Sequence, residues 1–431
     1  MKHLSDFPKI QTADRIFAVL YLLIGYGFVY AFTSREPERN LAVFTVFYAA
    51  AVLGYLYRKG ICPPKESWFW LAAMLAMGIP FAFWSVLYIF QILGLMVTAA
   101  YWTLLASGRL LEKDRTSQWV FFDCWNGLFM VPFGNFSCQL RVLAGSQGAE
   151  DGEEKKEKKG SGILLGILLA VPVLIVVLPL LSSADAGFER MAGGLVAYIR
   201  ENLMEVFLRA LFAVPVAAYL YGLVFGGVSG RNTDRIQKEQ LQETERYVRK
   251  IPDTAVCTVL AILCMIYLVF TGLQGSYLFS AFAGRIPEDF TYAEYARRGF
   301  FELCQIGLCN LVVIGCAGLF SRSRSTQNRG LACLTVLLSV FTLLLIGTAV
   351  SKLGMYMSVY GLTVNRILPL VFLLWMVLVF VLLIFRQKRA FPMVRICVMA
   401  GAVLFCLLCV FPVEAWTDAY NVWARGRGYI V

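Results

Sequence analysis

Long apolar stretches alternate with shorter polar segments along this chain of 431 residues. Eleven of these stretches are nearly free of charge. The apolar core of a bilayer needs about 20 apolar residues per helix, so each stretch is a candidate span. The predicted spans are Ile16–Phe32, Leu41–Tyr57, Trp68–Trp84, Val86–Ala106, Gly162–Leu181, Met204–Val228, Ala255–Leu273, Phe300–Phe320, Leu331–Val350, Ile367–Phe385 and Ile396–Phe411. The pattern therefore predicts an all-α, polytopic transmembrane bundle of about eleven spans.

The longest uncharged run, from Trp68 to Ala106, is too long for a single helix. Gly78 and Pro80 lie near its middle, and both residue types interrupt helices. We therefore expect two spans joined by a tight turn.

Basic residues are divided unequally between the two sets of loops. When the loops alternate across the membrane, 27 of the 39 Lys and Arg share the side of the amino terminus, 11 lie opposite, and Arg209 lies within a span. Basic loops remain in the cytoplasm, so we expect the amino terminus inside and the carboxyl terminus outside. The net charge of +11 then matches the anionic inner leaflet, and no nucleic-acid partner is expected.

Two inner segments are long enough to act outside the membrane, and the first separates an amino-terminal four-span region (1–106) from a carboxyl-terminal seven-span region (162–431). This loop, 107–161, combines a predicted interfacial or re-entrant helix over 119–136 with a charged, flexible linker over 144–161. The second segment, 232–250, predicts a short helix capped by Asn232 or Thr233. It is either a solvated connector or a docking helix for a cytoplasmic protein partner.

Polar residues that suggest a binding site lie on the predicted outer side, where several recur every three or four residues along the start of the eighth span. They could instead be separate interfacial anchors, because Tyr, Trp and Arg are common at the headgroup level. We expect these residues to converge on one outward-facing polar site. The candidates are Asp185, Glu189, Tyr295, Arg298, Glu302, Gln305, Asn310, Lys352, Tyr360, Arg366, Asp418 and Asn421.

Some of these residues belong to longer sequence motifs. LLSSADAGF, TYAEYARRGFFEL, YMSVYGLT with Arg366, and the terminal DAYN resemble an uncharacterised bacterial membrane family, domain of unknown function 4173, over roughly 162–421. The resemblance implies a multi-pass protein of the bacterial cytoplasmic membrane. It supplies no catalytic residues.

Residue types argue against several enzymatic mechanisms. The single histidine, His3, precedes the first span, so histidine-dependent hydrolysis and zinc chemistry lack their usual base or ligand. Cys406 and Cys409 form one CxxC within a span with no second pair, and no phosphate-binding loop is present. We therefore expect no metal site and no cofactor.

The function expected first is a non-enzymatic regulatory, sensory or scaffold component with an outward-facing polar site. The alternative is a transporter or channel for a small solute or lipid, although no inverted repeat is visible. A membrane glycosyl or lipid transferase ranks third, because the first outer loop carries Glu36 and Glu38 but is short. The ligand and the oligomeric state are left open by the sequence.

Overall fold

The computed structural model describes residues 7–85, 87–144, 177, 204–280, 300–323 and 328–429. These residues are helical and form no strand within the described ranges, which confirms the all-α prediction. Nine helices in the described part of the chain are long and apolar enough to cross a bilayer, so this is a membrane protein. The chain forms two compact units, one from residues 1–85, 89–115 and 121–235, and one from 86–88, 116–120 and 236–431.

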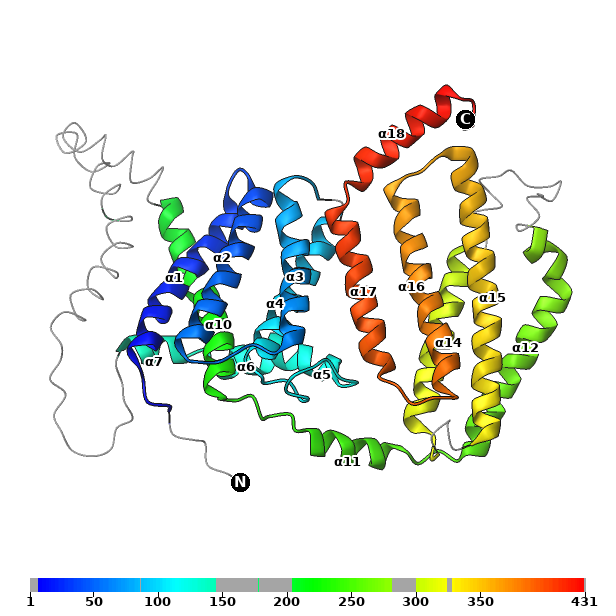
Figure 1. Ribbon diagram of the computed structural model, residues 1–431, viewed down its shortest axis with the longest axis horizontal. Helices are drawn as coiled ribbons and strands as arrows, with labels where there is room; N and C mark the ends of the chain where they lie inside the picture. Colours follow the sequence, from blue (N-terminus) through cyan, green and yellow to red (C-terminus); the bar gives the residue numbers. More distant parts are fainter. Residues whose placement is uncertain are drawn as a thin grey trace. The chain divides into compact units, whose positions relative to one another are not determined.

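Within its described residues, unit 1 contains four long helices, one shorter apolar helix and several short helices in the segment after α4 (Figure 1). The long helices are α1 (Thr12–Thr33), α2 (Pro37–Arg58), α4 (Tyr88–Ala106) and α10 (Met204–Ser229). The shorter elements are α3 (Lys65–Gly78), η1 (Ile79–Ala82), α5 (Val120–Trp125), η2 (Asn126–Met130), α6 (Val131–Gly134) and α7 (Cys138–Ala144).

Small residues bring α1 and α10 into close contact. A β carbon at Gly25 would lie 2.6 Å from the Ala213 carbonyl oxygen and 2.7 Å from the Ala217 β carbon. Apolar helices gain no hydrophobic energy by associating within lipid, so close van der Waals packing at small residues holds them together. Gly78 has the same role between α3 and α2, because a β carbon there would lie 2.5 Å from Thr45.

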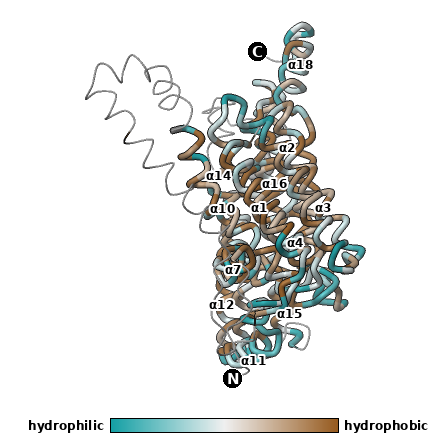
Figure 2. The backbone as a smooth tube through the Cα atoms, turned by 90° about the vertical axis from the view of Figure 1, so that its left-hand side faces the viewer, coloured by the Kyte–Doolittle hydropathy of each residue, from teal (hydrophilic) through white to brown (hydrophobic). Residues whose placement is uncertain are grey.

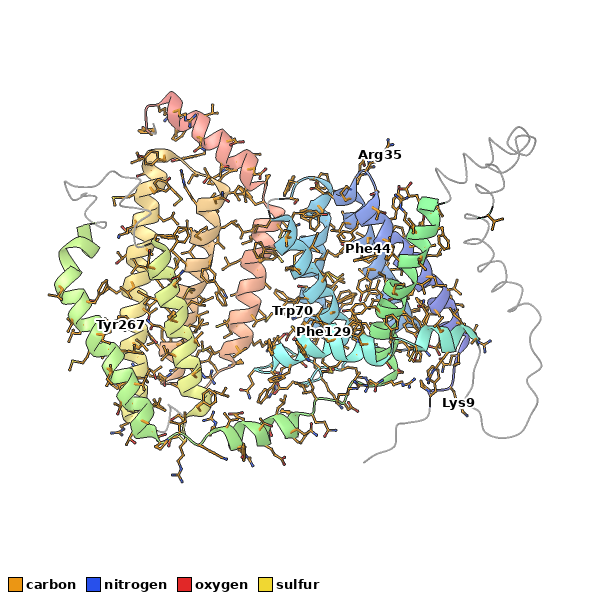
Figure 3. All side chains as sticks on the ribbon, turned by 180° about the vertical axis from the view of Figure 1, so that it is seen from behind. Lys9, Arg35, Phe44, Trp70, Phe129 and Tyr267 are labelled. Carbon is orange, nitrogen blue, oxygen red and sulfur yellow. The ribbon has the colours of Figure 1, made fainter. Side chains whose placement is uncertain are left out.

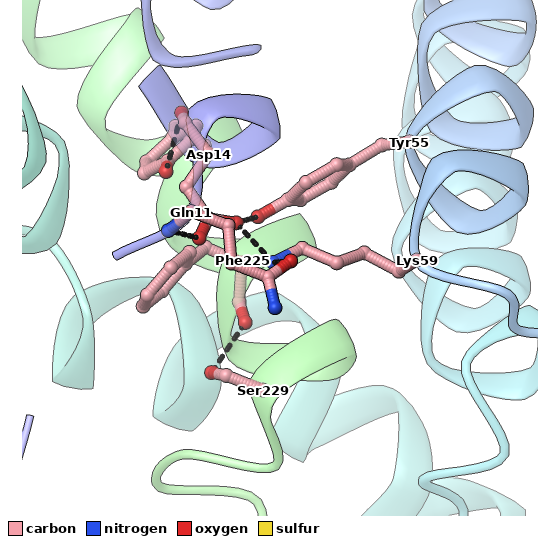
Figure 4. Close-up of polar contacts among 7 residues, drawn as sticks. Gln11, Asp14, Tyr55, Lys59, Phe225 and Ser229 are labelled. Atoms are coloured by element: carbon pink, nitrogen blue, oxygen red, sulfur yellow. Dashed lines mark hydrogen bonds and ion pairs between the residues drawn. The ribbon is translucent and has the colours of Figure 1, made fainter. Parts of the chain in front are cut away.

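A buried ion pair joins the first turn of α1 to the last turn of α2 (Figure 4). The Lys59 ammonium lies 2.6 Å from the Asp14 carboxylate, which also accepts a hydrogen bond from the Tyr55 hydroxyl. Tyr221 of α10 donates to the Asp14 backbone carbonyl at 3.1 Å, so three helices meet at one residue. Removing one partner would leave a buried charge without compensation, so this pair fixes the positions of α1 and α2 relative to each other.

Unit 2 is built around α15, the longest helix described (Figure 1). Leu338 and Ile346 of α15 pack with Leu373, Met376 and Phe380 in a fully buried core. Figure 2 shows mostly hydrophobic residues along the spanning helices, and hydrophilic residues at α11, near α18 and in several connections. The helices are α11 (Lys238–Val248), α12 (Asp253–Ser280), α14 (Phe300–Phe320), α15 (Arg329–Tyr360), α16 (Val364–Arg386), α17 (Met393–Val410) and α18 (Val413–Gly426).

Most predicted spans match observed helices, and the mismatches have local causes. The run from Trp68 to Ala106 does divide, since α3 ends at Gly78 and α4 follows a short 3₁₀ turn. The helix predicted over 119–136 is also present, as α5, η2 and α6. The predicted span at 162–181 lies outside the described residues apart from residue 177, and the predicted linker over 144–161 lies almost wholly outside them. The three-region division at residues 106 and 161 stays a prediction.

The predicted cap of the 232–250 helix is wrong. The helix α11 begins only at Lys238, with Gln237 at its amino-terminal cap. Asn232 instead has a φ of 56° in a turn, and its side-chain amide donates to the Gly134 carbonyl oxygen at 2.8 Å. The turn is therefore held by α6 contacts, which sequence spacing does not reveal.

Replacing Gly25 with valine is expected to destabilise unit 1. Valine adds a β carbon and two methyl groups where the β carbon alone lies 2.6 Å from the Ala213 carbonyl oxygen, and overpacking of this kind costs about 1–3 kcal/mol. The melting temperature of detergent-solubilised protein, followed by fluorescence-detected size exclusion, should fall. Gly27→Val is the matched control, because no atom lies within 4 Å of a β carbon at Gly27. An equal loss in both variants would contradict the packing argument.

Candidate functional site

Eight of the twelve predicted site residues lie in the described part of unit 2. The other four, Asp185, Glu189, Tyr295 and Arg298, lie outside the described residues. Of the eight, Gln305 and Asp418 are exposed and are not considered further as binding residues. The remaining six divide into a mid-helix hydrogen-bond group and a group near the carboxyl end of α15.

The mid-helix group is centred on Asn310, which is 1% exposed. Its side-chain oxygen accepts a hydrogen bond from the Tyr267 hydroxyl at 2.8 Å, and its amide donates to the Thr342 hydroxyl at 3.0 Å. Tyr267 projects from α12 (Figure 3), so the amide links α12, α14 and α15. Both ends of the Asn310 amide are therefore engaged by protein, and we interpret it as a structural link.

The helix α15 extends ten residues beyond its predicted end and places Lys352 inside the helix rather than in a loop. Gly354 is accommodated within the helix, and α15 ends at Gly361, whose φ is 78°. Lys352 is 1% exposed and interacts electrostatically with Glu302 of α14. A buried cation in an apolar helix is costly and commonly marks a functional position.

The connection from α15 to α16 is organised by Arg366. Its guanidinium lies 4.2 Å from the centre of the Tyr356 ring and donates hydrogen bonds to the carbonyl oxygens of Tyr360 and Gly361. Lys352, Tyr356 and Tyr360 recur every four residues and so follow one face of α15. This face of α15 runs from the buried Lys352 to Tyr360, whose carbonyl oxygen binds Arg366 of α16.

The amphipathic helix α18 closes this connection. Asn421 accepts a hydrogen bond from the Leu362 backbone N–H at 2.8 Å and donates to the Leu362 carbonyl oxygen at 2.7 Å. The sequence identified Asn421 but not the helix that carries it. The apolar or aromatic residues Val413, Trp416 and Tyr420 recur at helical spacing, which is the signal that could have predicted α18.

We call the residues Glu302, Lys352, Tyr356, Tyr360, Arg366 and Asn421 the α15 cluster. It contains two cations and one carboxylate, with two phenol rings and an amide. Such a set suits an anionic or zwitterionic ligand, because the cations exceed the acid. Among the described residues no group of three His, Cys, Asp or Glu side chains could hold a metal ion, and every cysteine is a free thiol.

Unit 1 holds a second buried polar group, on α5 and η2. Asp123, 1% exposed, accepts a hydrogen bond from the Leu111 backbone N–H at 2.8 Å, and Asn126 donates to the Thr233 carbonyl oxygen at 3.1 Å. Burial raises the pKa of the Asp123 carboxyl to about 6; the Leu111 hydrogen bond opposes this shift and the Glu112 charge adds to it. These contacts hold the short helices against the neighbouring turns, and their residue types alone do not distinguish this role from ligand binding.

Comparison with known proteins adds a family. The model of a domain of unknown function, DUF4153, matches residues 69–428, which covers most of the chain and the whole α15 cluster. The chain belongs to the DUF4153 family. The predicted number, 4173, is therefore wrong, while the expectation of an uncharacterised domain family is confirmed. No curated protein and no solved structure matches the chain.

In this DUF4153 protein, Asn421→Ala is expected to loosen the α15–α16 connection. Loss of two hydrogen bonds, each worth about 0.5–1.5 kcal/mol, should speed amide hydrogen exchange at residues 361–363 several-fold. Hydrogen–deuterium exchange mass spectrometry measures this directly. Asp418→Ala, on the same helix but exposed, is the control and should leave the exchange unchanged. Unchanged exchange in Asn421→Ala would show that Asn421 does not hold the connection.

Proposed function

We propose that the protein is a non-enzymatic regulatory or sensory membrane component that recognises a small anionic or zwitterionic ligand at the α15 cluster. The observation that carries the proposal is the buried Lys352, which shares a helix face with Tyr356, the ring against which Arg366 packs. Lys352 and Arg366 can both pair with a carboxylate or phosphate. When that ligand leaves, Glu302 remains as the counter-charge, so the contacts of the cluster change between the bound and free states.

The cluster faces outward in this proposal. The excess of basic residues on the amino-terminal side supports a cytoplasmic amino terminus, and the order of helices then puts the α15–α16 connection and α18 on the opposite side. The membrane is proposed to be the bacterial cytoplasmic membrane. The exposed helix α11 would lie in the cytoplasm, where it could dock a protein partner.

Transport is the alternative function. The hydrogen bonds of Asn310 argue against transport, because the amide already bonds Tyr267 and Thr342 and would have to break these bonds to bind a passing solute. Flux into proteoliposomes that depends on Glu302 would favour transport over recognition.

The proposed orientation predicts opposite results from two carboxyl-terminal fusions expressed in a bacterial host. Alkaline phosphatase, active only outside the cytoplasm, should be active, and green fluorescent protein should remain dark. Fusions made after Arg389, in the connection between α16 and α17, should give the reverse pattern and serve as the internal control. A fluorescent carboxyl-terminal fusion would place the α15 cluster on the cytoplasmic side and refute its outward orientation.

Native mass spectrometry of gently extracted protein tests recognition. A retained small molecule is expected in the wild type, with at least a tenfold lower occupancy in Lys352→Met, because that change removes the buried cation while keeping most of the side-chain volume. Glu302→Gln should also alter the occupancy. Gln305→Ala, an exposed change one turn further along α14, should retain the wild-type occupancy.

Three outcomes separate the proposals. Loss in Lys352→Met with retention in Gln305→Ala supports recognition at the α15 cluster. A molecule retained equally by all variants excludes that cluster as its site. A co-purifying protein without any small molecule instead favours a scaffold.

A further inference from the structure

An elongated cavity of about 460 Å³ lies among α1, α2, α4 and α10 of unit 1. This volume is within the range of about 300–1,000 Å³ found for small-molecule sites. Its walls include Phe28 of α1, Phe44 of α2 (Figure 3), Met96 of α4 and Val216 of α10. None of the candidate residues of the α15 cluster lines it.

The cavity runs along the helices. The α10 wall includes Pro215, Tyr219 and Leu223, and the α4 wall extends from Ile92 to Ala100. Eight residues of helix correspond to about 12 Å at 1.5 Å per residue, so each of these two walls is about 12 Å long. Phe133 of α6 lines the same cavity and packs edge-on against Tyr219 with 5.6 Å between ring centres, at the end where the short helices lie.

The lining offers no unused polar group for a ligand. Its two hydroxyls are already bonded, since Tyr48 pairs with Thr103 at 2.8 Å and Tyr219 donates to the Leu128 carbonyl oxygen at 2.8 Å. A polar molecule would lose its hydrogen bonds with water and gain none. A hydrocarbon breaks no hydrogen bond on leaving the lipid, and in the cavity it makes dispersion contacts with the aromatic rings.

A cation lies near the other end of the cavity. Phe32 lines the cavity, and the next residue, Thr33, accepts hydrogen bonds from the Arg209 guanidinium at 2.9 and 3.2 Å. Arg209 lies six residues before Pro215 on α10, or about 9 Å along the helix. It is also paired with Glu205, whose side chain is 58% exposed, so a phosphate at Arg209 would compete with this carboxylate. An arginine at this position can bind a phosphate.

We propose that this cavity holds one acyl chain of a membrane phospholipid, with the lipid phosphate beside Arg209. The chain lies parallel to the helices with its methyl end at Phe133 and its glycerol end at Phe32. This lipid would be a bound component of unit 1, separate from the ligand of the α15 cluster.

Paired tryptophan variants of the full-length protein test the proposal. Val216→Trp fills the cavity, whereas Val214→Trp, two residues earlier on α10, is a 44% exposed position that does not line it. The probe is phosphatidylglycerol added to delipidated protein and detected by native mass spectrometry. Val216→Trp is expected to reduce the tightest-bound lipid at least tenfold, and Val214→Trp should leave it unchanged. Equal retention in both folded variants would overturn the proposal.

Photolabelling of the wild-type protein does not depend on any variant folding. A phosphatidylglycerol with a diazirine at the methyl end of one acyl chain should label Tyr219, and one with the diazirine near the glycerol should label Phe28; both line the cavity and are only partly exposed. Labels confined to the exposed residues Leu211, Phe212 and Val214 would mean ordinary bilayer contact and would overturn the proposal.

Discussion

The lack of water in the bilayer core is the constraint on which both units depend. Every polar side chain placed there needs a protein partner, because an unpaired group costs several kcal/mol. In α15, Thr335, Ser339 and Thr342 each donate to the carbonyl oxygen four residues earlier and so add no demand for water. Asn310 cannot satisfy its amide in this way, and its hydrogen bonds to α12 and α15 make it a link between helices.

The same constraint explains why the charged contacts lie at helix ends. In unit 1, Asp14 and Lys59 meet at the first turn of α1 and the last turn of α2, and in unit 2 Arg366 binds the connection after α15. Lys352 is the exception, since it is buried eight residues before the end of its helix. The Glu302 charge that acts on it comes from a different helix, so a ligand that competes for Lys352 would also change this electrostatic interaction between α14 and α15.

The sequence predicted the helices of the described residues well because apolar length is a local property. The predicted bounds of α14 are the observed ones, Phe300–Phe320. Prediction failed where the end of a helix or the conformation of a residue did not follow from local hydropathy. The end of α15 depends on Gly361 rather than on hydropathy, and the conformation of Asn232 depends on α6, about a hundred residues earlier. The sequence selected Lys352, Arg366 and Asn421 by residue type together with Asn310, but it could not show what each side chain contacts. Asn421 bonds Leu362 in the α15–α16 connection, whereas Asn310 links three helices.

The difference between Asn310, which links helices, and the α15 cluster bears on how the protein could work. A solute that crossed unit 2 beside Asn310 would have to replace the hydrogen bonds from Tyr267 and to Thr342 in a place without water, and each unmade bond there carries the full desolvation penalty. A ligand held at the α15 cluster breaks none of these bonds. It needs only to bias contacts at the ends of α14, α15 and α16, where the clamp of Asn421 on Leu362 offers a few kcal/mol to be shifted. Recognition without passage, as proposed for the α15 cluster, would therefore leave the hydrogen bonds of Asn310 intact.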